Sequence, residues 1–220
     1  MKKLTSLEFL WRKEYLSIFI IWLVTISGLI GIWLGYGDWF LPKTIFNLLL
    51  GAAILLWNFP IKNGWKSLAI WTSIYLMGMV AEWIGVNTGL LFGDYSYGNN
   101  LGPKIVGVPP IIGINWVVLV FLTAFISKRI IPHKYAAALL GALLMVGLDF
   151  FIEPVAQRFD FWSWHENFAP LKNFIHWFFV SLLMQIIVMN ELPEKNSSLP
   201  IHHFLSQVLF FTFFYVIYQF

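Results

Sequence analysis

Residues 143–156 read LLMVGLDFFIEPVA and place two carboxylates, Asp149 and Glu153, in an otherwise apolar stretch. A spacing of four positions puts both side chains on one face of a helix, one turn apart. A second apolar stretch, residues 76–86 (LMGMVAEWIGV), carries Glu82 in the same kind of setting. Because a charge inside hydrocarbon is costly, an acid that is kept there is a candidate for function.

The composition of the whole chain is that of an integral membrane protein. Of the 220 residues, 59% are hydrophobic and 11% are charged, and the mean hydropathy is +0.75, far from the averages of soluble domains. We therefore predict an all-α, polytopic membrane protein, in which residues 1–220 form a single integral membrane domain. The absence of cysteine from the sequence excludes disulfides, thiolate nucleophiles and cysteine-ligated zinc.

Seven apolar stretches have about the length that a membrane-spanning helix needs, roughly 17 to 25 residues. We place them at Tyr15–Gly35, Thr44–Phe59, Lys66–Val86, Val108–Ile126, Tyr135–Ile152, Phe174–Asn190 and His202–Tyr218. The second stretch is short, and Pro60 ends it. The first is too long for a signal peptide and lacks a cleavage pattern, so we expect it to remain in the mature protein.

The distribution of basic residues between the two sides predicts the orientation. With these spans, ten of the 14 Lys and Arg residues lie on the side of the N-terminus and four lie on the other side. The positive-inside rule then places the N-terminus in the cytoplasm and the protein, as a multi-pass protein, in the cell membrane. Basic clusters beside the spans also account for the pI of about 9.1, so we expect no nucleic-acid partner.

Two long loops, residues 87–107 and 154–173, fall on the external side together with the acids. The first contains candidate polar contacts and aromatic residues at Asn87, Thr88, Asp94, Tyr95 and Tyr97. The second is dense in aromatics, with Trp162 and Trp164 flanking a serine. Interfacial belts account for most of the 12 tryptophans, but these two lie close to the acids along the chain. One site built from several segments is therefore geometrically possible.

The pair Asp149 and Glu153 suggests acid–base chemistry. Two like charges so close in a medium of low dielectric constant cannot both ionise readily, so one group would hold its proton beside an ionised neighbour. The plain alternatives are that Glu153 is a hydrated helix-end residue paired with Arg158, and that Glu82 makes only a structural hydrogen bond to a neighbouring helix, which Gly85 and Gly89 would allow to pack closely.

Two familiar classes of membrane protein do not fit the sequence. Di-iron hydroxylases and desaturases need clustered histidines, whereas this chain has five histidines and no such cluster. Retinal proteins need a lysine in mid-membrane for the Schiff base, and no predicted span carries one there. We expect no metal and no cofactor.

The run AEWIGVNTGLLFGDYSYGNNLGPKIVGVPPIIGINW (residues 81–116) and the elements GLDFFIEPVA, FWSW and APLKNFIHWFF carry a resemblance. They resemble the carotenoid biosynthesis membrane family of bacterial carotenoid 1′,2′-hydratases and archaeal bisanhydrobacterioruberin hydratase. The similarity covers roughly Tyr75 to Phe179, about half of the chain.

The resemblance implies addition of water to the terminal 1,2 double bond of an acyclic carotenoid, which gives a tertiary alcohol. A neutral buried acid would protonate the alkene, aromatic faces would stabilise the cation, and a carboxylate would orient water. We expect Asp149 to be the proton donor and Glu82 or Glu153 to position the water. The residues that would shape the cation site are Tyr95, Tyr97, Trp162 and Trp164. Asp94 would support the loop, and Asn87 and Thr88 would offer polar contacts. The implied partners are lycopene, γ-carotene or a bisanhydrobacterioruberin-like carotenoid, the lipid bilayer and other enzymes of the carotenoid pathway.

Three alternatives stay open at this point. A carotenoid cyclase or isomerase begins with the same protonation and differs only in the fate of the cation. A small proton-coupled transporter would also use buried acids, although the chain shows no convincing internal repeat of the kind common in transporters. A non-catalytic scaffold for a pigment-synthesis complex would leave the acids without a role.

Overall fold

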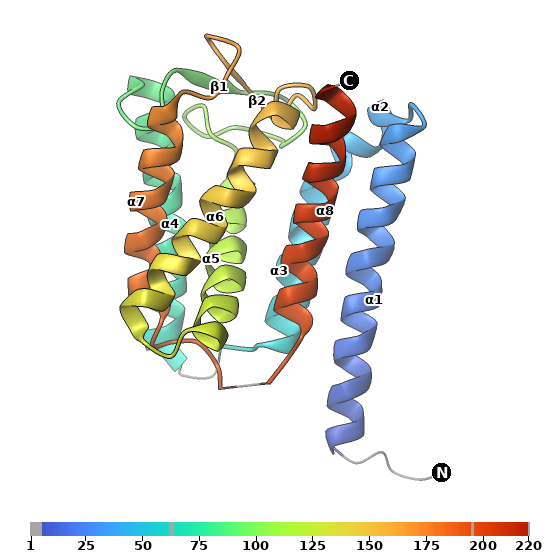
Figure 1. The fold of residues 1–220 in the computed structure, drawn as a ribbon, viewed down its shortest axis with the longest axis vertical. Helices are drawn as coiled ribbons and strands as arrows, with labels where there is room; N and C mark the ends of the chain where they lie inside the picture. Colours follow the sequence, from blue (N-terminus) through green and yellow to red (C-terminus); the bar gives the residue numbers. More distant parts are fainter. Residues whose placement is uncertain (1–5, 62–63, 195, 220) are drawn as a thin grey trace.

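The structure of this protein is a computed structural model that describes residues 6–61, 64–194 and 196–219, and it is a bundle of long helices (Figure 1). Within these residues, seven helical segments are long and apolar enough to cross a membrane, so the predicted all-α polytopic fold is confirmed. The long helices are α1 (Ser6–Trp33), α3 (Thr44–Asn58), α4 (Gly64–Thr88), α5 (Ile111–Ile130), α6 (Lys134–Ala156), α7 (Leu171–Val188) and α8 (Leu199–Gln219). Four basic residues used to predict the orientation lie outside the described residues: Lys2, Lys3, Lys62 and Lys195.

The segment boundaries differ from the predicted ones in two instructive places. The second span is not short, because α2 (Gly37–Phe40) and the 3₁₀ turn η1 (Leu41–Lys43) lead into α3 and extend the helical segment to residues 37–58. Helix α6 continues through Pro154 to Ala156. Proline has no backbone N–H and so removes one hydrogen bond of the helix, but it does not end α6. Glu153 therefore lies within the helix and not at its end.

Helix α5 is the centre of the bundle. It packs against α3, α4, α6, α7 and α8, and 72% of its most apolar window is buried, against 39% or less in the other spans. A helix that is hydrophobic on all sides is expected at such a position. Helix α1 lies at the edge of the bundle beside α8 (Figure 1).

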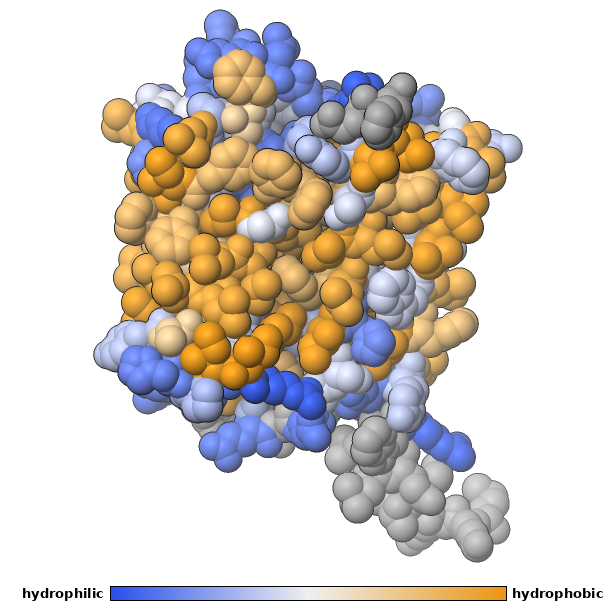
Figure 2. Space-filling model, viewed as in Figure 1, coloured by the Kyte–Doolittle hydropathy of each residue, from blue (hydrophilic) through white to orange (hydrophobic). Residues whose placement is uncertain are grey.

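The outer surface of the bundle suits a bilayer. Figure 2 shows a hydrophobic band across the middle of the face that it draws, with hydrophilic residues gathered at both ends. Large apolar side chains of the spanning segments are exposed; Phe19, Phe46 and Phe179 are 61%, 69% and 61% exposed. Hydrocarbon is a better environment for these side chains than water, so the protein is a multi-pass membrane protein.

A short β-ribbon closes one end of the bundle, which we call the ribbon end (Figure 1). Strands β1 (Tyr95–Tyr97) and β2 (Trp162–Trp164) pair antiparallel, with Tyr95 opposite Trp164 and Tyr97 opposite Trp162. Beyond β1, a Cβ on Gly98 would lie 2.2 Å from the backbone oxygen of Asp160, so only glycine allows the two loops to approach this closely.

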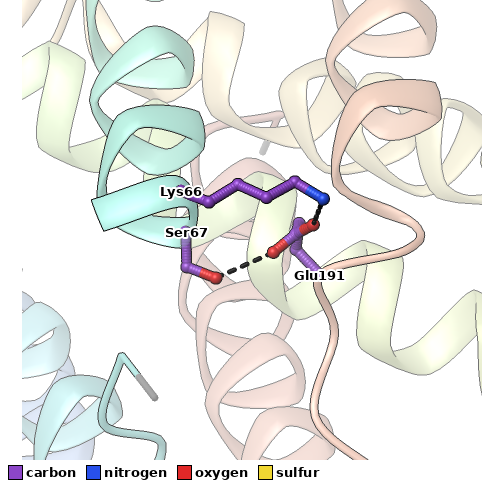
Figure 3. Close-up of polar contacts among 3 residues, drawn as sticks. All are labelled: Lys66, Ser67 and Glu191. Atoms are coloured by element: carbon purple, nitrogen blue, oxygen red, sulfur yellow. Dashed lines mark hydrogen bonds and ion pairs between the residues drawn. The ribbon is translucent and has the colours of Figure 1, made fainter. Parts of the chain in front are cut away.

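At the opposite end, Glu191 connects the start of α4 to the segment that follows α7 (Figure 3). Its carboxylate accepts a hydrogen bond of 2.7 Å from the hydroxyl of Ser67 and lies 3.8 Å from the Lys66 ammonium. Ser67 is buried whereas the Lys66 side chain is 79% exposed. The hydrogen bond is therefore the more important of the two contacts, because exposed ion pairs contribute little.

Candidate active site

The three acids found in apolar sequence lie around one small cavity. Glu82, Asp149 and Glu153 are 3%, 2% and 6% exposed, and all three line a space of about 30 Å³ just inside the ribbon end. Such a volume holds roughly one or two water molecules. Much of the remaining wall is aromatic: Phe92, Tyr95, Tyr97, Trp116, Trp162, Trp164 and Trp177.

Glu82 projects from α4 into a set of three hydrogen-bond donors. The hydroxyls of Tyr95 and Tyr97 donate to its Oε2 at 2.5 and 2.7 Å, and Nε1 of Trp116 donates to its Oε1 at 3.0 Å. These donors come from the ribbon and from α5, so three separate segments meet at one carboxylate. These hydrogen bonds offset part of the hydration that a carboxylate loses on burial.

Two glycines on α4 make room for those donors. A Cβ on Gly78, one turn before Glu82, would lie 2.7 Å from the Trp116 ring, and a Cβ on Gly85, one turn after it, would lie 2.7 Å from the Tyr95 hydroxyl. From the sequence, Gly85 was expected to allow a neighbouring helix to pack closely. The structure instead places an aromatic side chain of the ribbon against Gly85, and it is Gly78 that accommodates the side chain of a helix.

Asp149 and Glu153 project side by side from α6, as their spacing predicted, and share a partner on α7. The amide nitrogen of Asn173 donates to Oδ2 of Asp149 at 2.9 Å and to Oε1 of Glu153 at 3.0 Å. Glu153 also accepts hydrogen bonds at its Oε2 from Nε1 of Trp162 (3.0 Å) and of Trp164 (2.6 Å). Asn173 thus holds the two carboxyl groups together at one wall of the cavity.

The ribbon delivers its aromatic side chains by simple strand alternation. In Tyr-Ser-Tyr and Trp-Ser-Trp, the first and third residues share a face, while Ser96 and Ser163 pair on the exposed face. The tyrosines donate to Glu82 and the tryptophans to Glu153. One small ribbon therefore fixes two of the three acids.

The ribbon tyrosines act as permanent hydrogen-bond donors. Burial, and then the negative charge of Glu82, raise the pKa of the Tyr95 and Tyr97 hydroxyls well above their usual value. Both hydroxyls therefore keep their protons throughout the physiological pH range and remain directed at the carboxylate.

A stacked pair of indoles forms another wall of the cavity. The ring centroids of Trp116 and Trp177 are 4.0 Å apart and their planes differ by 16°. Phe92 packs against Trp177 at 6.2 Å between centroids. The cavity thus combines three carboxyl groups with electron-rich aromatic rings, a combination suited to a positively charged species.

Three residues of the predicted site, Asn87, Thr88 and Asp94, lie outside this cavity and are exposed. The Asn87 amide donates to the backbone oxygens of Trp83 and Val106, and the Thr88 hydroxyl donates to that of Ile84. Asp94 accepts a backbone hydrogen bond from His165 through its main-chain oxygen. The first two side chains tie down the loop after α4. The structure therefore gathers Glu82, Tyr95, Tyr97, Asp149, Glu153, Trp162 and Trp164, and leaves Asn87, Thr88 and Asp94 apart.

Several lining residues were not singled out from the sequence, among them Asn115, Trp116, Asn173 and Trp177. All four fall in runs that carried the family resemblance, which was the available signal for them. The alternative pairing of Glu153 with Arg158 is not what the structure has, because the Arg158 guanidinium lies over the Tyr218 ring, 4.6 Å from its centroid. In the part of the chain that is described, no group of three His, Asp or Glu side chains is arranged to hold a metal ion.

The fold and the site define a multi-pass membrane protein with acidic groups enclosed near one end of its helical bundle. Comparison with protein families matches residues 43–220 to the family described as carotenoid biosynthesis protein. The chain belongs to this family, which supports a role in carotenoid biosynthesis. Neither the comparison with curated proteins nor that with solved structures finds a match.

Proposed function

We propose that this protein hydrates the terminal 1,2 double bond of an acyclic carotenoid. The observation that carries the proposal is that three buried carboxyl groups line one water-sized cavity with an aromatic wall. Alkene hydration needs a proton donor, a surface that stabilises a cation, and a single positioned water molecule. The carboxyl groups and aromatic rings around the cavity provide the first two, and the cavity has room for the water molecule.

Asp149 is the proton donor in this proposal. Within the described residues it accepts one hydrogen bond, from Asn173 to its Oδ2, whereas Glu82 and Glu153 each accept three. Donors directed at a carboxylate favour its ionised form, so the acid with the fewest donors is the best suited to hold a proton. Its Oδ1 is then free to present that proton to the alkene.

In the proposed reaction, the proton that the cavity gives to the alkene is replaced by the proton that water loses. The π electrons of the double bond take the Asp149 proton to form a C–H bond, which leaves a tertiary cation and the Asp149 carboxylate. Aromatic faces around the cavity stabilise the cation. Water then forms the C–O bond, a second carboxylate accepts the proton that the water loses, and this proton returns to Asp149.

Glu153 is the better placed of the two remaining carboxylates to position the water. The same Asn173 amide holds it beside Asp149, so the proton released by water has a short return path. Glu82 is fixed by the ribbon and α5 and contributes negative charge that favours the cation. In the membrane, we propose that the N-terminus is cytoplasmic and that the ribbon end faces outward.

The direct test is expression in a host that makes lycopene or γ-carotene, followed by chromatography and mass spectrometry of the pigments. The proposal expects a product heavier by one water, with the hydroxyl on the terminal tertiary carbon. A product of unchanged mass with a ring or a shifted double bond would instead indicate a cyclase or an isomerase. Unchanged pigment from a well-expressed, correctly inserted protein would argue against all three reactions.

Replacing Glu153 or Glu82 with Gln forms a matched pair, because each carboxylate accepts three hydrogen bonds and each substitution removes one negative charge and one acceptor oxygen. We expect Glu153→Gln to lower hydration by about 10²- to 10⁴-fold and to let the unquenched cation lose a proton again. In D₂O this variant should therefore put deuterium into unhydrated carotenoid. Glu82→Gln should protonate the alkene more slowly but still hydrate it. If the two results were exchanged, Glu82 would be the residue that positions water.

A further inference from the structure

A second, larger cavity lies on the other side of α5 from the acids. It has a volume of about 590 Å³ and lies between α1, the η1–α3 segment, α5 and α8. Its lining is mainly hydrophobic, with Val24, Ile54, Val118, Phe210 and Phe211 among the side chains that face it. Sites for small molecules typically have a volume of this order and this apolar character.

The two cavities meet at Asn115, which lines both. On α5, Trp116 and Leu119 face the acids while Val118 faces the large cavity, so this helix is the wall between them. Asn115 is the position where the wall is shared. In the described part of the chain its side-chain amide makes no hydrogen bond, so its rearrangement on ligand entry would break none.

The large cavity is elongated and reaches the lipid-facing surface. On the η1–α3 segment it extends from Lys43 to Ile54, and at 1.5 Å per helical residue this separation is roughly 16 Å. Trp39 and Phe46 both line the cavity and are 59% and 69% exposed. A long hydrophobic molecule dissolved in the bilayer can therefore enter from the side without crossing water.

We propose that this cavity binds the polyene body of the substrate, a long unsaturated hydrocarbon chain, while its terminal double bond passes Asn115 to reach Asp149. This inference rests on the proposed function, since it assigns the part of the same substrate that is not chemically changed. The cavity of about 30 Å³ beside the acids has room for only one or two water molecules, so the reacting end must displace water or side chains to enter it, and no space remains there for the rest of the molecule. The binding energy for a long hydrocarbon must therefore come from elsewhere, and the adjoining apolar cavity supplies that surface.

Gly28 allows the assignment to be tested by filling the cavity. It lies on α1 in the lining, and a Cβ there would be 3.8 Å from the nearest side-chain atom, on Phe210, so Gly28→Leu adds bulk without a forced clash. Gly147→Leu is the matched control, because Gly147 is an exposed residue of α6 with no atom within 4 Å of its added Cβ. Val118→Phe fills the same cavity from α5 and is a second, independent variant.

Binding is measured separately from reaction by placing each variant in an Asp149→Asn background. The proteins are purified from carotenoid-producing cells, and the pigment retained per protein is read by absorbance. We expect Gly28→Leu and Val118→Phe to lower retention by at least roughly tenfold, and Gly147→Leu to leave it unchanged. With Asp149 intact, the first two variants should lose hydrated product in parallel.

The outcomes separate this inference from the proposed function. If the wild-type protein never hydrates carotenoid, the hydratase proposal is wrong. If Gly28→Leu nevertheless loses its bound pigment, the assignment of the binding cavity is supported. Full retention of pigment by both filled variants, with hydration intact, would overturn the cavity assignment alone. So would a cavity occupied by phospholipid that carotenoid does not displace.

Discussion

Asp149→Asn is expected to abolish hydration, with turnover lower by about 10²- to 10⁴-fold. Asn is nearly the same size as Asp and can still accept the hydrogen bond from Asn173, but it has no acidic proton to transfer. The variant should therefore insert into the membrane and fold normally. Measurement of hydrated and unhydrated carotenoid in the producing host gives the size of the effect.

The control for this experiment is Asp38→Asn, the same chemical change at an exposed residue of α2. It should leave both the pigment profile and the thermal unfolding of the purified protein as they are in the wild type. Full hydration by Asp149→Asn would assign the proton to another group. Loss of folded protein in this variant alone would make Asp149 a structural residue rather than the donor.

The membrane-spanning part of the fold was predictable because it depends on local properties of the chain. A helix in lipid satisfies its own backbone hydrogen bonds, so length and hydrophobicity are enough to mark it. The spacing of Asp149 and Glu153 predicted a shared face for the same reason, since both lie on one helix. The end of the fifth span was predicted at Ile152, whereas α6 continues through Pro154 to Ala156.

The β-ribbon could not be predicted with the same ease. Tyr95–Tyr97 and Trp162–Trp164 alternate with a period of two, but three residues are too few to separate a strand from a loop. Their pairing joins residues more than sixty positions apart and depends on α4 and α6 ending at the same end of the bundle. For this reason the sequence did not reveal which ribbon residues donate hydrogen bonds to the acids.

Asn173 and Asn87 show that residue type alone does not identify the residues of the site. Both are single amides close to the ribbon end of a spanning helix, and of the two only Asn87 was predicted from the sequence to be a site residue. In the structure Asn173 is buried and donates to two carboxyl groups, whereas Asn87 is exposed and donates to backbone oxygens. What separates them is the packing of α7 against α6, which contacts between distant segments decide.

Gly85→Ala should lower hydration by up to about 10²-fold through the position of the ribbon. The added Cβ would lie 2.7 Å from the Tyr95 hydroxyl and 2.9 Å from the Phe92 ring, so Tyr95 must move and give up its hydrogen bond to Glu82. Ala is a better helix former than Gly by about 1 kcal/mol, so damage to α4 itself is not the cause. Gly147→Ala, on open surface, is the matched control and should keep full activity.

A double-mutant cycle identifies the contact responsible. Tyr95→Phe removes the hydroxyl that Gly85→Ala displaces, so the double variant should hydrate about as well as the worse of the two single variants. The measurement is the hydrated fraction of pigment for all four proteins at equal expression. Losses that simply multiply would mean that Gly85 acts through Phe92 or the helix. Tyr95, Tyr97 and Trp116 hold the Glu82 carboxylate in place. A fully active Gly85→Ala protein would therefore show that hydration does not require the Glu82 carboxylate to be held there.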